Sequence, residues 1–256
     1  MLLSEQSGAV LTLTLNRPKA NAFDQNLIDL LLEALRRAEA EASVRCVVLT
    51  GAGRVFSAGQ DVTAFAKVEG PVSFRRHLER TYNRLILRMR RLEKPIIGAI
   101  NGAAAGAGLG IALATDIRVA GRSARFVFGF SGIGLTADSG TSLSLPLLIG
   151  LGRASEMAFT NAPLSADQAL TFGLVNRVVE DDRLMAEAGA LAESIAAGPT
   201  RALGLTKRAF QRALLAELES TLEYESYLQE AAGATKDHAE GVKAFLEKRE
   251  PKFQGR

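Results

Sequence analysis

One stretch, residues 94–116, constrains the fold more than any other part of the chain. It reads KPIIGAINGAAAGAGLGIALATD, and its short apolar run Ile96–Ile100 is typical of a buried strand. An Asn-Gly pair then predicts a turn, and the small residues of Ala103–Gly110 lead into a predicted helix over Ala107–Ala114. Because only Leu109 in that run has a side chain larger than a methyl group, backbone amides at the helix start can approach a ligand closely. Small residues suit close packing of a helix on a sheet equally well, so this stretch alone leaves both interpretations open.

A glycine-rich loop follows a second apolar run. Val44–Leu49 predicts a strand, and Thr50–Asp61, which reads TGAGRVFSAGQD, leaves it at a comparable point. Two loops of this kind, each placed after a strand, can each offer one backbone N–H to a ligand. N–H groups directed at one point are a common means of stabilising an oxyanion in enzymes.

Hydrophobic periodicity predicts the elements around these loops. A strand is expected over Val10–Leu15, and an amphipathic helix is expected from an Asp24 cap to about Ala42. Strand, helix and strand in this order begin a right-handed βαβ pattern. Further predictions are a helical region over Pro71–Arg91, strands over Ile117–Ala120 and Arg125–Phe128, and an almost entirely helical chain from Asp182 onward.

Composition and charge argue against several classes of protein. The chain has 256 residues, enough for one large domain or for a domain with an appended subdomain, and its net charge of +3 is too small to indicate nucleic-acid binding. The one cysteine, Cys46, excludes an intrachain disulfide. The chain contains no run of about 18 apolar residues and its start lacks a basic leader before an apolar core. We therefore expect no membrane segment and a cytoplasmic protein.

The two loops together resemble a known superfamily. FSAGQD at 56–61 and INGAAAGAGLGIALATD at 100–116 are similar to the corresponding segments of the enoyl-CoA hydratase/isomerase (crotonase) superfamily. The resemblance runs from Val10 to the C-terminus, and it implies an α/β fold, a crotonase-type spiral of ββα turns with a C-terminal helical trimerisation region. We expect a spiral core with the acyl-CoA site over 1–197 and a helical oligomerisation region over 198–256, assembled as a homotrimer or a dimer of trimers.

The resemblance also implies roles for individual residues. In the family, one N–H from each loop polarises the thioester carbonyl of an acyl-CoA, and these positions correspond to Ala58 and Ala107, with glycine more usual at the second. The segment 16–22, NRPKANA, resembles the family's opening NRPxxxNA with one residue fewer, and that opening contacts the ADP part of CoA. The implied CoA-binding residues are Lys19, Ala20, Ala22, Ala58, Gln60, Asp61, Val62, Phe245 and Lys248, of which the last two can approach the CoA of an adjacent subunit.

Two positions argue against simple hydration. Hydratases of this superfamily use two glutamates to handle the water and the proton at C2, and the corresponding positions here are Gly110 and Phe130. Neither side chain can transfer a proton. We therefore expect two-glutamate hydration to be disfavoured and this side of the pocket to be apolar.

Asp138 is the candidate proton-transfer group. It lies in Ile133–Gly140, IGLTADSG, which resembles the GLxPDSG segment of the phenylacetate-pathway isomerases, with Ala137 in place of the proline. Those enzymes convert a ring-1,2-epoxyphenylacetyl-CoA to an oxepin-CoA, and their single catalytic aspartate aligns with Asp138. Local sequence alone favours Asp138 as the cap of a helix over Ser139–Ile149. Because both glutamates are missing and two amide loops are present, we instead favour Asp138 as the proton-transfer group.

The resemblance therefore implies an acyl-CoA isomerase that holds a thioester enolate in a two-amide oxyanion hole, with Asp138 as proton shuttle. The epoxyphenylacetyl-CoA reaction is the leading hypothesis. Alternatives are a general enoyl-CoA isomerase or hydratase of fatty-acid metabolism, a dehalogenase-like enzyme in which Asp138 attacks an aroyl-CoA ring, and a non-catalytic CoA-binding subunit. CoA is part of the substrate, so no separate cofactor is expected. The only histidines, His77 and His238, are placed so that a metal site or a Ser/His/Asp triad has little support.

The C-terminal region predicts a helix with a large apolar face. We expect it to pack on a neighbouring subunit, with Glu223, Glu225 and Glu230 on its solvated face. The apolar face is made by Leu214, Leu215, Leu218, Leu222 and Leu228.

Overall fold

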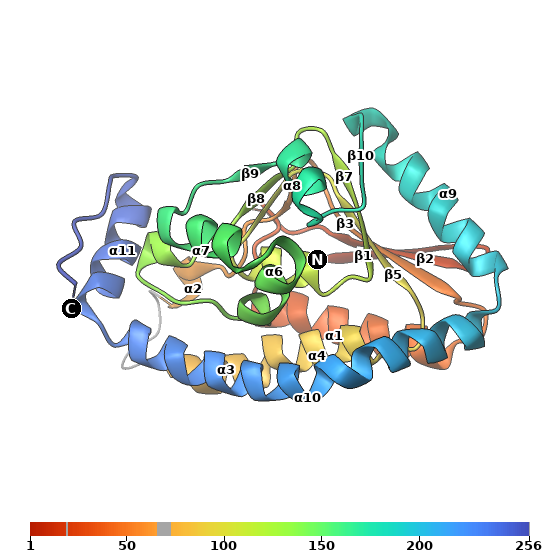
Figure 1. Cartoon of the computed structure of the whole chain (residues 1–256), viewed down its shortest axis with the longest axis horizontal. Coiled ribbons are helices and arrows are strands. Elements are labelled where there is room, and N and C mark those ends of the chain that lie inside the picture. The colour runs from red at the N-terminus through yellow and green to blue at the C-terminus, as the bar shows by residue number, and fades with distance from the viewer. Residues whose placement is uncertain (19, 66–72, 256) are drawn as a thin grey trace.

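The computed structural model describes residues 1–18, 20–65 and 73–255, and it leaves the side chains of 64, 65 and 213–216 undescribed. Lys19 and Pro71 therefore lie outside the described residues. The strands and most of the shorter helices lie above α10 (Thr200–Gly233) in Figure 1, and this helix of 34 residues runs along most of the molecule.

The remaining elements alternate along the chain between short strands and helices. The strands are β1 (Leu2–Ser7), β2 (Val10–Leu15), β3 (Cys46–Gly51), β4 (Val55–Ser57), β5 (Ile96–Ile100), β6 (Ala103–Ala105), β7 (Ile117–Gly121), β8 (Arg125–Val127), β9 (Leu164–Ser165) and β10 (Arg177–Val179). The helices are α1 (Gln25–Ala40), α2 (Val62–Phe65), α3 (Phe74–Arg80), α4 (Tyr82–Arg91), α5 (Ala107–Leu113), α6 (Thr141–Ile149), α7 (Leu151–Thr160), α8 (Ala166–Phe172), α9 (Leu184–Ala197), α10 and α11 (Lys236–Glu247), with 3₁₀ turns η1 (Ser131–Ile133) and η2 (Asp181–Arg183).

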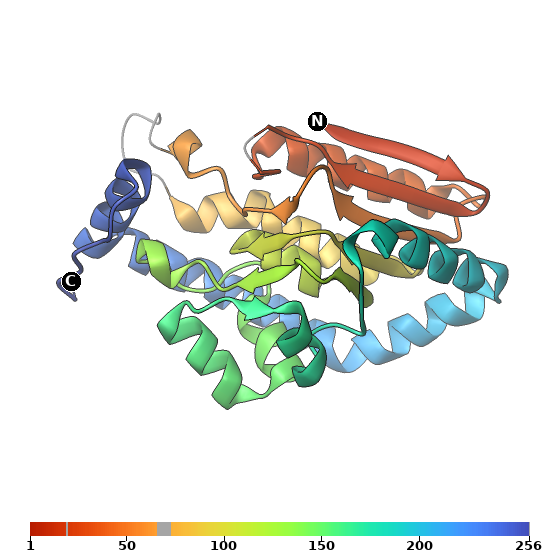
Figure 2. The same ribbon diagram turned by 90° about the horizontal axis from the view of Figure 1, so that it is seen from above.

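The strands form two sheets that share a repeating connection. A six-stranded sheet has the order β1-β2-β3-β5-β7-β10, and a four-stranded sheet has the order β4-β6-β8-β9. The successive pairs β3–β4, β5–β6 and β7–β8 each contribute one strand to each sheet, and helices follow each pair. This is the predicted spiral of ββα turns. Figure 2 shows the strands from above, with α9 beside the larger sheet.

The larger sheet is covered on both faces, which explains the continuous apolar run in β3. Cys46 and Val48 point to α9, where small residues such as Ala188 and Ala192 allow close contact. Val47 and Leu49 point to the opposite face and join the main core. Because neither face of such a strand meets solvent, its sequence does not alternate between apolar and polar residues.

Several predicted boundaries are confirmed. The strands over Val10–Leu15 and Ile96–Ile100 have the expected bounds, and the Asp24 side chain caps α1 by accepting a hydrogen bond from the Leu27 N–H. The expected helix up to Arg91 is instead two helices, because the backbone breaks at Thr81 with φ −119° and ψ −93°. The apolar periodicity continues across this break, so it does not reveal it.

The start of α6 differs from the prediction for a backbone reason. Ser139 and Gly140 adopt left-handed conformations with φ of +57° and +73°, so the helix begins at Thr141 and not at Ser139. Left-handed residues cannot continue a right-handed helix. The carboxylate of Asp138 makes no capping hydrogen bond to this helix.

Glu225 of α10 caps α6 instead, which corrects the prediction that it is solvated. It is 2% exposed, and its carboxylate accepts from the N–H groups of Gly140 at 2.8 Å and Ser142 at 2.9 Å. Burial raises the pKa of Glu225 to about 7, although the hydrogen bonds from Ser142 and Gly140 oppose that shift. Glu230 is also engaged, because it accepts from the Arg75 N–H at 2.8 Å at the start of α3. Both carboxylates meet unpaired N–H groups at helix starts.

The apolar face of α10 packs partly within its own chain. Leu218 and Leu222 are 4% and 2% exposed and belong to the main core, so the prediction that they pack on a neighbouring subunit is wrong for these two residues. Exposed aromatic side chains of the same helix, Phe210, Tyr224 and Tyr227, face outward. The division into 1–197 and 198–256 stays a prediction.

The C-terminal helix α11 docks on η1 of the same chain. A Cβ atom added to Gly241 would lie 2.7 Å from the carbonyl carbon of Ile133, so glycine permits the close approach. The tail then turns back, since the N–H groups of Gln254 and Gly255 donate to the Asp237 carboxylate at 2.6 and 2.7 Å. Within the described residues, no helix is long and apolar enough to cross a membrane.

Candidate active site

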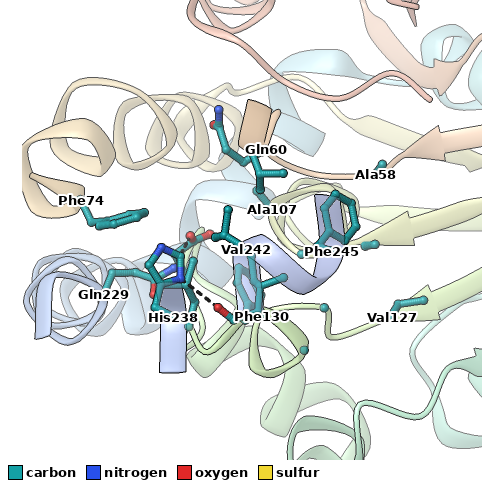
Figure 3. Close-up of a pocket in the computed structure, with 18 of the residues that line it drawn as sticks. Ala58, Gln60, Phe74, Ala107, Val127, Phe130, Gln229, His238, Val242 and Phe245 are labelled. Carbon is teal, nitrogen blue, oxygen red and sulfur yellow. Dashed lines mark hydrogen bonds between the residues drawn. The ribbon is translucent and has the colours of Figure 1, made fainter. Parts of the chain in front are cut away.

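A cavity of about 360 Å³ lies where the start of α5 and the turn η1 meet the helices α3, α10 and α11 (Figure 3). Most of its lining is apolar. The sequence-predicted site residues that line it are Ala58, Gln60, Val62, Ala107, Asp138 and Phe245. The two amide loops and the aspartate, which are far apart in the sequence, therefore meet at one cavity.

Among the described residues, Ala20, Ala22, Asp61 and Lys248 are predicted to bind CoA but do not line this cavity. Ala22 is buried, and its carbonyl accepts from Arg17. Asp61 is also buried and holds the Arg17 guanidinium at 2.7 Å. Burial alone would raise the pKa of Asp61, but hydrogen bonds from Thr63 and Arg17 outweigh it and lower the pKa. Their contacts with CoA stay a prediction. The remaining three are Ala20, which is exposed, Lys248, which ends α11, and Lys19, which lies outside the described residues.

Ala107 presents an open N–H group to the cavity. It is the first residue of α5, directly after Gly106, whose φ of +53° sets the turn into the helix. The first N–H groups of a helix have no partner inside the helix. In the described part of the chain, no carbonyl or side chain accepts a hydrogen bond from the Ala107 N–H. This N–H can therefore bind an oxygen of a ligand.

The FSAGQD loop lies directly against this helix start. A Cβ atom added to Gly59 would lie 2.7 Å from the Ala105 carbonyl oxygen and 3.2 Å from the Ala107 nitrogen, and Gly59 has φ of +84°. Only glycine accepts both the conformation and the contact. The neighbouring Ala58 lines the same cavity as Ala107.

The Ala58 N–H itself is engaged in this structure. It donates to the carbonyl oxygen of Ala20 at 3.0 Å. Ala20 and Asn21 have φ of +60° and +53°, and the Asn21 side chain fixes the loop by donating to the Val55 carbonyl at 2.8 Å. A thioester oxygen must therefore displace the Ala20 carbonyl before it can use both N–H groups.

Asp138 lies in the cavity wall with a hydrogen-bond donor on each carboxylate oxygen. The Ser139 hydroxyl donates to Oδ1 at 2.7 Å, and Gln229 Nε2 donates to Oδ2 at 2.9 Å. The residue is 7% exposed. Burial raises the pKa of Asp138 to about 6, although the two hydrogen bonds pull it down. Because Glu225 occupies the start of α6, the capping interpretation of Asp138 is wrong.

Gln229 orients the Asp138 carboxylate, and sequence analysis did not identify it. Its Oε1 accepts from the Thr136 N–H at 3.1 Å. Since that contact requires the oxygen, the amide nitrogen must face Asp138. Gln229 also lines the cavity (Figure 3). Nothing in the local sequence of α10 marks it, because its partners are about 90 residues away in sequence.

The two positions that lack glutamates differ in their surroundings. Gly110 packs on the Asp138–Ser139 turn, and a Cβ atom there would lie 2.5 Å from the Ser139 Cβ, so a glutamate has no room. Phe130 lines the cavity and packs edge-on against Phe128 with ring centroids 5.0 Å apart. Phe130 makes its part of the cavity wall apolar, as expected, but Gly110 does not line the cavity.

Both histidines line the same cavity, which the sequence did not reveal. His77 Nε2 lies 3.2 Å from Gln60 Oε1, which also accepts from the Tyr82 hydroxyl at 2.7 Å. Burial lowers the pKa of His77. His238 Nδ1 lies 2.8 Å from the Ile133 carbonyl oxygen, which can only accept, so Nδ1 carries the hydrogen. Among the described residues, no three His, Cys, Asp or Glu side chains are grouped to hold a metal ion.

The chain is similar over most of its length to several known proteins. The chain is 43% identical over 258 residues to 1,2-epoxyphenylacetyl-CoA isomerase of Escherichia coli (strain K12), covering 100% of this chain and 98% of that protein. It is 39% identical over 226 residues to 4-chlorobenzoyl coenzyme A dehalogenase-2 of Arthrobacter sp, covering 86% and 81%. The crystal structure of an enoyl-CoA hydratase from Mycobacterium avium subsp. paratuberculosis K-10 matches with a TM-score of 0.89 and 32% identity, covering 99% and 98%. Residues 5–256 match the sequence profile described as enoyl-CoA hydratase/isomerase, and the chain belongs to that family.

Proposed function

We propose that the protein is an acyl-CoA isomerase in which Asp138 moves one proton between two carbons of the acyl group through a thioester enolate. The observation that carries this proposal is the position of Asp138. Its carboxylate lines an apolar cavity beside the open N–H of Ala107, and it does not cap a helix. At positions 110 and 130 no second carboxylate is available.

The proposed reaction uses these groups in order. The thioester oxygen accepts from the Ala107 N–H and, once the Ala20 carbonyl is displaced, from the Ala58 N–H. The Asp138 carboxylate removes a proton from the carbon next to the thioester or from the γ-carbon, and the electron pair becomes the enolate. Each N–H donor is worth about 3 kcal/mol to such an anion. The protonated Asp138 then returns the proton to the other carbon, so the product is an isomer and no water is consumed.

The acyl group that we propose is 2-(1,2-epoxy-1,2-dihydrophenyl)acetyl, with simple 3-enoyl chains as further substrates. The relative at 43% identity bears that activity in its name. The cavity wall contains the aromatic rings of Phe74, Phe130 and Phe245, which suit an aryl or alkenyl group. CoA enters as part of the substrate, and we propose a homotrimer or a dimer of trimers as the assembly.

Hydration should be slow. Because Gly110 and Phe130 cannot activate water, crotonyl-CoA hydration is expected to be far slower than isomerisation of a 3-enoyl-CoA by the same preparation. Both rates can be followed by absorbance and by product mass. Hydration at a rate comparable to isomerisation would contradict the single-carboxylate mechanism.

The pH dependence should report on Asp138. A base must be ionised to accept a proton, and the pKa of Asp138 is raised to about 6, so kcat/KM should fall as pH decreases through this value. The Gln229→Leu variant loses a hydrogen bond that lowers the pKa of Asp138. The fall in kcat/KM should therefore begin at a higher pH in this variant than in wild type. Circular dichroism across the same range is the control for unfolding. If kcat/KM fell at the same pH in Gln229→Leu as in wild type, the titrating group would not be Asp138.

A dehalogenase is the second candidate. Two observations favour it, namely the 39% identity to a 4-chlorobenzoyl coenzyme A dehalogenase and the position of His77 and His238 in the cavity. In that reaction Asp138 would form a bond to the ring carbon and chloride would leave. Incubation with 4-chlorobenzoyl-CoA should release no chloride if the isomerase proposal is correct. Chloride release with no isomerisation would favour this second candidate, and CoA binding with no turnover would indicate a non-catalytic subunit.

A further inference from the structure

A second polar site lies away from the acyl-CoA cavity, where α4, β7 and α10 approach one another. Three basic side chains converge there, namely Arg90, Arg118 and Lys207, and Arg118 and Lys207 are 5% and 8% exposed. Among the described residues, Asp116 is the one carboxylate that acts on all three by its charge. Its Oδ2 already binds the Lys207 ammonium at 2.7 Å and the Ile96 N–H at 2.8 Å.

Neutral groups hold both guanidinium groups in place. Arg90 donates from Nε to Gln211 Oε1 at 3.1 Å and from Nη1 to the Ala114 carbonyl at 3.4 Å. Arg118 donates from Nε to the Leu174 carbonyl at 2.6 Å and from Nη1 to the Thr115 carbonyl at 2.7 Å. Among the described residues, none accepts a hydrogen bond from Nη2 of either arginine.

The two arginines line a cavity of about 200 Å³ together with Gln211 and Ser144. A water molecule takes about 30 Å³ in the liquid, so this space is large enough for a carboxylate or an oxyanion of a few heavy atoms. Asp116, Thr115 and several leucine side chains form the rest of the wall, and one of these leucines, Leu147, is 59% exposed. The Asp116 carboxylate therefore lies at this cavity, but its Oδ2 is held by Lys207 and the Ile96 N–H.

The charge balance of this site is unfavourable without an anion. Placing like charges in a poorly solvated site is costly, and a counter-ion removes that cost. Burial lowers the pKa of Arg118 to about 10, and repulsion by Arg90 adds to this shift. Burial also lowers the pKa of Arg90. A guanidinium group matches the two oxygens of a carboxylate or of an oxyanion better than it matches single carbonyls.

We propose that the cavity between Arg90 and Arg118 is an anion-binding site that takes a carboxylate or a small oxyanion. Two sources share this chemistry, a free anion from solution and an Asp or Glu side chain of a second copy of this chain. The site is separate from the acyl-CoA cavity, so its test does not depend on the proposed activity.

The experiment compares the full-length protein with three variants. Arg118→Gln and Arg90→Gln each remove one guanidinium, and Arg122→Gln is the matched control, because Arg122 is exposed beyond the end of β7 and pairs with Glu180. Isothermal titration calorimetry with sodium phosphate and with sodium acetate tests the free anion. Sedimentation velocity over a range of protein concentrations tests the second copy.

A free anion predicts one saturable site per chain in wild type and in Arg122→Gln, with binding about 10-fold to 100-fold weaker in the other two variants. A side chain from a second copy predicts no such titration, but Arg118→Gln and Arg90→Gln should dissociate at concentrations where wild type and Arg122→Gln stay assembled. If Arg118→Gln does not fold, Arg90→Gln decides the result, because Arg90 is less buried. Anion titrations and assembly that are unchanged in Arg90→Gln would overturn the proposal.

Discussion

Asp138→Asn should lower isomerase turnover by about 100-fold to 10,000-fold, the range that general acid–base assistance typically contributes. The amide is nearly isosteric with the carboxylate but cannot accept a proton at neutral pH. Its oxygen can still accept from Gln229 Nε2, and its nitrogen can donate to the Ser139 hydroxyl, which can turn to accept. Fold and CoA affinity should therefore survive, and the loss should appear in kcat.

Turnover of a 3-enoyl-CoA and solvent-deuterium exchange measure this loss. Label should enter the α- or γ-carbon with wild type and not with Asp138→Asn. Glu225→Gln is the informative comparison, because Glu225 is the neighbouring buried carboxylate that caps α6 and lies outside the cavity lining. This variant should lose stability and keep more turnover than Asp138→Asn. Near wild-type turnover and exchange in Asp138→Asn would remove Asp138 from the chemistry.

Ala107→Pro should reduce kcat by about 100-fold to 1,000-fold, the usual effect of losing one oxyanion donor. Proline has no N–H, so the substitution removes the proposed donor. Ala107 is the first residue of α5, a position where proline is well tolerated because its N–H has no partner within the helix and its fixed φ suits the helix. The chemical effect can thus be separated from a folding defect.

Ala107→Gly is the matched control, since it keeps the N–H and should keep activity. Circular dichroism and CoA binding establish that each variant is folded. Ala107 is a cleaner test than Ala58, because the Ala58 N–H is already paired with the Ala20 carbonyl. A folded Ala107→Pro variant with wild-type kcat would show that this N–H does not bind the thioester oxygen.

Much of the fold was predictable because it depends on local patterns. Apolar runs such as Val10–Leu15 and Ile96–Ile100 form the expected strands, and Asp24 caps α1 through a contact three residues away. Local patterns fail where tertiary packing overrides them. The break at Thr81 interrupts a continuous apolar stripe. The helix α6 begins two residues after the predicted Ser139, because Ser139 and Gly140 adopt left-handed conformations and the Gly140 N–H donates to Glu225.

In the candidate site too, some residues follow from local sequence patterns and others only from tertiary contacts. The loops that carry Ala58, Ala107 and Asp138 have short-range signatures, because small residues, positive φ and a turn at a helix start leave a mark in consecutive residues. The sequence by itself determined the family and the lack of both glutamates, and it predicted that these three residues belong to the site. Only the tertiary structure decided that Gln229 orients Asp138, and that His77 and His238 share the cavity. These contacts join segments about 90 to 160 residues apart through the packing of α10 and α11, and such packing leaves no local pattern in the chain.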